Sequence, residues 1–159
     1  MTAPSEPLSP ADQRALAVRL FNRSWELLES TRDAAGDREL LASALASRLH
    51  WEGVGTDENL AAGDWLVGHV ASQLGYADLA LDFATAAHER AVDADPPVPA
   101  WLVASTQEGL ARAHAVAGHD QERDHWAADA RETLQGVDDD EDRELIESQL
   151  ETVPGLDEG

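Results

Sequence analysis

The residues of this chain best suited to binding another molecule form two groups, each spaced for one face of a helix. Trp65, His69 and Gln73 are separated by four residues each, so on a helix they stand one above another. Further along, Glu108 precedes Arg112 by four residues. With their near neighbours, the candidate binding residues are Trp65, His69, Ser72, Gln73, Ser105, Glu108 and Arg112. An indole beside an imidazole, an amide and an ion pair suits a peptide or a small polar ligand.

The same spacing also has a purely structural interpretation. Trp65 would then be a packing residue and His69 a solvated or buried imidazole. Glu108 and Arg112 would form an ordinary helical ion pair, worth a few tenths of a kcal/mol. The residues themselves leave the binding and the structural interpretation open.

A second hypothesis concerns His50, Asp64 and His69, which a turn between two helices could bring together around a small ligand or a metal ion. Asp64 and His69 are five residues apart, which is nearly a quarter turn beyond the best shared helical face, and no HExxH spacing occurs. The chain has no Cys, no GxSxG motif and no Gly-rich phosphate loop. We therefore expect no enzymatic activity and no cofactor, and we keep the three-residue site as the alternative.

Composition limits the partners that the chain can have. The 159 residues suffice for one domain, and 32 acidic residues against 11 basic ones, all Arg, give a net charge of -21. Such a surface repels nucleic acid and anionic lipid, and it opposes self-association beyond a monomer or a weak homodimer. The sequence has neither an apolar run of membrane-spanning length nor a signal peptide at its start, so we expect a cytoplasmic protein. The acidity serves either solubility or recognition of a partner.

The elements that must position the candidate residues are predicted to be paired helices. Two stretches share one construction, in which an apolar helix ends at Gly75 or Gly118 and a polar turn leads into an Ala-rich helix. Caps and proline-rich breaks extend the pattern to the whole chain. It predicts a disordered tail over 1–9, hairpins over about 10–52, 57–93 and 100–135, a capping helix over about 140–152 and a flexible tail over 155–159.

Local signals add detail to these helices. The first helix is expected to run from Pro10 to about Ser30, and Asp37 is expected to cap the second. The inward positions of the second helix are then predicted to be Leu41, Ala44, Leu45 and either Arg48 or Leu49. Thr56 and Asn59 have the spacing of a capping box without its usual Glu or Gln. In the last helix, an apolar stripe of Leu145, Ile146, Leu150 and Val153 is expected to cap the third hairpin.

The hairpins resemble tetratricopeptide (TPR) repeats. Gly68 matches the small position of the first repeat helix, and Ala80 and Ala87 match the two alanines of the second. The third hairpin matches with Leu110, Ala111 and Ala130, and has Arg123 where alanine is usual. The resemblance implies an all-α, TPR-like right-handed stack of three antiparallel helical hairpins plus a C-terminal capping helix, in which the first helix of each hairpin lines a concave groove. All seven candidate binding residues would lie in this groove.

The whole chain also resembles an uncharacterised group of bacterial TPR-like helical-repeat proteins. The matching elements are His50-Trp51, Gly63-Asp64-Trp65, the run from Gly109 to Asp120 and the run from Asp139 to Leu145. Ala62 stands where that group usually has Arg before the glycine. This resemblance implies the fold and no particular activity. From the repeat pattern we expect a protein-interaction module that binds a peptide or helix of a partner protein in its groove.

Overall fold

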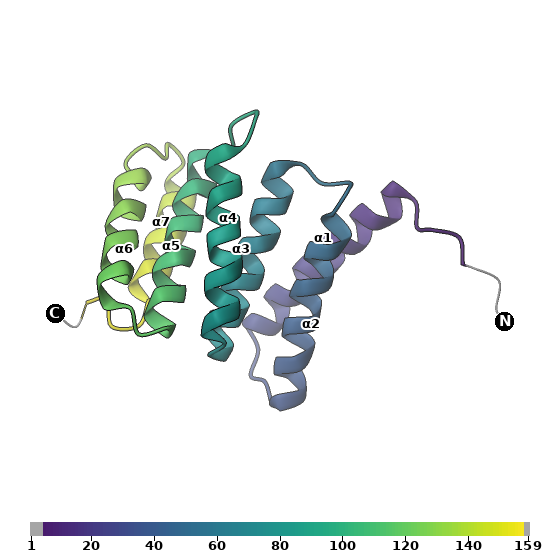
Figure 1. The fold of residues 1–159 in the computed structure, drawn as a ribbon, viewed down its shortest axis with the longest axis horizontal. Helices are drawn as coiled ribbons and strands as arrows, with labels where there is room; N and C mark the ends of the chain where they lie inside the picture. The colour runs from purple at the N-terminus through teal and green to yellow at the C-terminus, as the bar shows by residue number, and fades with distance from the viewer. Residues whose placement is uncertain (1–4, 158–159) are drawn as a thin grey trace.

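The computed structural model describes residues 5–157, and these form seven α-helices. The helices are α1 (Pro10–Leu28), α2 (Ala34–Trp51), α3 (Asp57–Leu74), α4 (Ala77–Asp93), α5 (Ala100–Val116), α6 (Asp120–Leu134) and α7 (Asp140–Glu151). Helices α2 to α6 follow one another along the long axis of the molecule, while α7 turns back beside α5 and α6 (Figure 1). All the predicted helices are present. Residues 1–4 and 158–159, the outer parts of the two predicted tails, lie outside the described residues, and 5–9 contain no helix.

Side-chain caps fix where several helices begin. The Ser9 hydroxyl accepts a hydrogen bond from the Asp12 backbone N–H, and Pro10 takes the first helical position of α1. At α3, the box formed by Thr56 and Asn59 is complete, because each side chain accepts from the backbone N–H of the other. We had expected an incomplete box. The Asn59 amide oxygen accepts as the usual Glu or Gln would.

The expected start of α2 is wrong, and its expected buried face is right for Ala44 and for Leu41, which packs against the core, and wrong for Leu45 and Leu49. Asp33, not Asp37, caps this helix, and its carboxylate accepts from the Gly36 N–H. The buried face consists of Leu40, Ser43, Ala44, Ser47 and Trp51, while Leu45 and Leu49 are exposed. The Ser47 hydroxyl donates to the carbonyl of Ala17 on α1 at 2.7 Å. Short serine side chains let α1 approach closely. Close packing of the two helices therefore decided which face of α2 is buried, and the hydrophobicity of Leu45 and Leu49 did not.

The helices pack in sequential pairs, α1 with α2, α3 with α4 and α5 with α6, and the pairs stack through α2 on α3 and α4 on α5. This arrangement is consistent with a stack of helical hairpins. At the centre of the second pair, a Cβ on Gly68 would lie 3.1 Å from the backbone nitrogen of Ala84. The missing side chain of Gly68 therefore allows α3 and α4 to approach closely. Ala80 and Ala87 of α4 are fully buried.

The stack has two unlike sides. The odd-numbered helices contact one another in order, α1 with α3, α3 with α5 and α5 with α7. Within residues 5–157, the backbones of α2 and α4, and of α4 and α6, do not approach each other in this way, and α4 meets α6 through the side chains of His88 and Trp126, whose ring centroids lie 4.9 Å apart. The odd-numbered helices therefore form the inner, more crowded side. None of the seven helices is long and apolar enough to cross a membrane.

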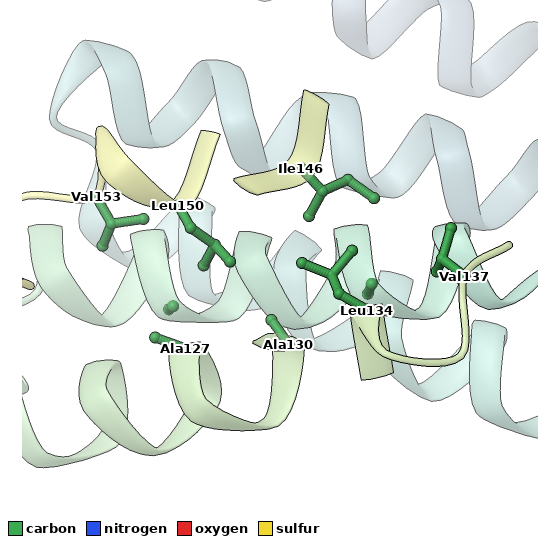
Figure 2. Close-up of a cluster of buried hydrophobic side chains, with 9 residues drawn as sticks. Ala127, Ala130, Leu134, Val137, Ile146, Leu150 and Val153 are labelled. Atoms are coloured by element: carbon green, nitrogen blue, oxygen red, sulfur yellow. The ribbon is translucent and has the colours of Figure 1, made fainter. Parts of the chain in front are cut away.

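Helix α7 covers the last hairpin, as Figure 2 shows. Ile146, Leu150 and Val153 point from the α7 segment toward Ala127, Ala130 and Leu134 of α6, and all of them are buried. The predicted capping of the third hairpin is confirmed. Leu145 does not share in it, because its side chain is 57% exposed. Past α7, Leu156 packs against the same cluster, so this part of the predicted flexible tail is packed onto the core.

Candidate functional site

The predicted groove residues lie on the inner side of the stack, on α3 and α5, and six of the seven are buried there. These are Trp65, His69, Ser72, Ser105, Glu108 and Arg112. Gln73, at the end of α3, is exposed. These six side chains are therefore largely covered: Trp25 of α1 packs on Trp65 and His69, and the end of α7 binds Arg112. Binding at the predicted groove stays a prediction.

Aromatic rings fill the part of this side between α1 and α3. The Trp65 and His69 rings stack with centroids 5.0 Å apart, and Trp25 of α1 stacks on Trp65 at 5.9 Å. Gly109 of α5 leaves room for the Trp65 indole, since a Cβ at this position would lie 3.1 Å from Trp65 Cδ1. Burial, aided by the positive charge of Arg112, lowers the pKa of His69 to about 3. His69 is therefore neutral at physiological pH and serves as an aromatic packing residue.

A buried ion pair joins α5 to the end of α7. The Glu108 carboxylate accepts from Arg112 at 2.7 and 2.8 Å, and Glu108 is fully buried. The same guanidinium donates to the carbonyl of Gln149 at 2.8 Å and to the Thr152 hydroxyl at 2.7 Å. Arg112 thus satisfies the carbonyl end of α7, where a cation also complements the helix dipole.

Burial of the ion pair affects the pKa of its carboxylate. Burial raises the pKa of Glu108, and Arg112 opposes that rise. The Trp65 indole N–H lies close enough to oppose it as well, although it makes no hydrogen bond of normal geometry within residues 5–157. Each of the two buried charges is therefore compensated by the other. Their role is to hold α7 on α5.

The alternative site built from His50, Asp64 and His69 is not assembled. Asp64 accepts from Arg48 of α2 at 2.5 Å and lies 3.7 Å from Arg90 of α4, so it links three helices. His50 lies 2.6 Å from the amide oxygen of Gln13 on α1, and His69 stacks on tryptophan. Over the described part of the chain, no group of three or more His, Asp or Glu is placed to hold a metal ion. No observation favours a ligand at these three residues.

The inner side keeps one apolar cleft, of about 160 Å³, bounded by α1 and α7 with α3 and α5 as its floor. Its lining includes Phe21, Trp25, Trp65, Trp101, Leu145 and Asp142. Of the predicted groove residues, Trp65 and Ser105 line this cleft, and the rest of its lining was not predicted to belong to a binding site. Trp25 and Trp101 could have been considered as candidates from the sequence, because the chain has only five tryptophans. Three of these five line this cleft. The contribution of α7 could not be predicted in this way, because it depends on how that helix docks.

Comparison with known proteins finds no match to a family model, to a curated protein or to a solved structure. The structure by itself defines the class: an all-α stack of helical hairpins whose inner side carries a cleft and its own C-terminal helix.

Proposed function

We propose that this protein is a non-enzymatic interaction module with TPR-like, right-handed stacking of its hairpins, which binds a peptide or helix of a partner protein on its inner side. The observation that carries the proposal is that this side already holds a helix, the α7 of the same chain. Stacked hairpins offer a surface for recognition and do not by themselves imply a reaction.

The docking of α7 supplies the pattern by which a partner helix would be held. Ile146, Leu150 and Val153, at helical spacing, bury one apolar stripe, and Arg112 binds the carbonyl end. The neighbouring cleft between α1 and α7 is apolar, so a partner helix that lies against α7 can insert a side chain there. We place this module in the cytoplasm. Its net charge of -21 favours a protein as its partner, because such a charge repels nucleic acid and anionic membranes.

Site-specific photo-crosslinking in the native host tests this function. A photoreactive amino acid replaces Leu145, which is 57% exposed at the mouth of the cleft. The matched control replaces Val92, which is 54% exposed on α4, on the outer side of the stack. We expect discrete adducts at position 145 that are absent at position 92. Equal adducts at both positions, or none at 145, would show that the inner side receives no protein.

A further inference from the structure

The volume of the cleft indicates what kind of group it accepts. Sites for metabolites and drug-sized ligands enclose about 300–1,000 Å³, whereas this cleft has about 160 Å³. A cavity of about 150 Å³ accepts a group the size of benzene. The cleft therefore fits one large side chain, and a ligand that offers a single side chain is part of a larger molecule.

The interior and the rim of the cleft differ in character. Inside lie the indoles of Trp25, Trp65 and Trp101, which suit an apolar or aromatic group. The lining contains one charged residue, Asp142, and no basic one. Asp142 belongs to the first turn of α7, which also contains Asp140 and Glu141. An apolar interior beside an acidic rim, on a protein of net charge -21, complements a segment that is apolar on one side and basic on the other.

We propose that the cleft between α1 and α7 is the docking site for a positively charged amphipathic helix of a partner protein, which seats one large apolar side chain among Trp25, Trp65 and Trp101. This inference rests on the proposed function and names its partner class. The apolar side chain is the anchor that excludes water from the indoles. Basic side chains beside it face the acidic start of α7, and this attraction speeds association and selects the partner.

Two synthetic peptides test the proposal on the full chain. Both lack tryptophan and have the same length and the same leucine positions of an amphipathic helix, with lysine at every polar position of one and glutamate in the other. Because three of the five tryptophans of the protein line the cleft, a change in tryptophan fluorescence reports its occupation. We expect the lysine peptide to bind and the glutamate peptide not to, and we expect binding to weaken at about 1 M salt, where the Debye length is about 3 Å.

Variants of the cleft separate docking from unspecific attraction. Ala62→Leu fills the cleft from α3, and Ala128→Leu makes the same change at an exposed position of α6. Leu145→Arg places a positive charge at the mouth on an exposed side chain, so the fold tolerates it. We expect Ala62→Leu and Leu145→Arg each to weaken binding of the lysine peptide by about tenfold. Ala128→Leu should leave it unchanged.

Each other outcome overturns the inference in a distinct way. Equal binding of the lysine peptide to all variants would show unspecific attraction by the acidic surface. Equal binding of both peptides, lost in Ala62→Leu, would overturn the basic partner class and still support the reception of a helix by the cleft. Binding of neither peptide would remove this cleft as a helix-docking site, and the crosslinking at Leu145 would then decide the proposed function separately.

Discussion

Replacing Arg112 with methionine tests how the structure holds α7 in place. Methionine keeps much of the length of the side chain and removes its charge and its donors. The variant loses the ion pair with Glu108 and the hydrogen bonds to Gln149 and Thr152. Glu108 stays fully buried, with no cation beside it.

The expected loss is large because one partner of a buried pair remains. Removal of one member of such a pair costs about 3–5 kcal/mol, and a domain of this size has a free energy of unfolding of about 5–15 kcal/mol. Replacing both members, as Glu108→Leu with Arg112→Met, removes the uncompensated carboxylate. The double variant should lose only about 1–2 kcal/mol, mainly from the unsatisfied end of α7. It should therefore be more stable than the single variant.

Urea unfolding, followed by circular dichroism and by tryptophan fluorescence, measures both losses at pH 7. The pH dependence gives a second readout. Burial already raises the pKa of Glu108, and loss of Arg112 removes a group that lowers it. The folded Arg112→Met variant then binds a proton more readily than the unfolded chain, so its stability relative to the double variant falls as pH rises above about 4.3, the ordinary value for Glu. A single variant that loses less than about 1 kcal/mol, or a double variant that loses more than the single, would refute this reasoning.

Three further predictions concern the packing of the stack. Gly68→Val forces side-chain atoms against the backbone of Ala84 and should lower stability by about 2–3 kcal/mol, whereas Gly136→Val, where a Cβ meets ordinary van der Waals distances, should cost little in the same thermal melts. His69 has a folded pKa of about 3 against an ordinary 6.5, so the unfolded chain binds the extra proton and wild-type stability falls as pH drops from about 6.5 toward 3. Relative to His69→Phe this fall reaches at most about 1.4 kcal/mol per pH unit, and parallel pH profiles of the two proteins would contradict it. Deletion of 140–159 uncovers the apolar cluster beneath α7 and should cause aggregation in light scattering, an expectation that a soluble, folded truncation would disprove.

The amino-acid sequence by itself determined the helices and their pairing. Ser9 with Pro10, Thr56, Gly75 and the prolines of 95–99 act through hydrogen bonds and backbone angles of their immediate neighbours, so their effects can be predicted locally. Short turns then force consecutive helices to be antiparallel neighbours. The spacing of apolar residues likewise predicted that α7 would cover the last hairpin.

Tertiary structure decided which of these faces are accessible. Trp65, His69, Glu108 and Arg112 have the same helical spacing whether they face solvent or the interior, and their burial follows from where α1 and α7 lie. Those positions depend on close contacts between residues distant in sequence, such as Ser47 with the Ala17 carbonyl, which hydrophobic periodicity does not record. The cleft exists for the same reason. It is the space left between helices whose separation is set by the small residues at their contacts, and no single helix contains the information that fixes it.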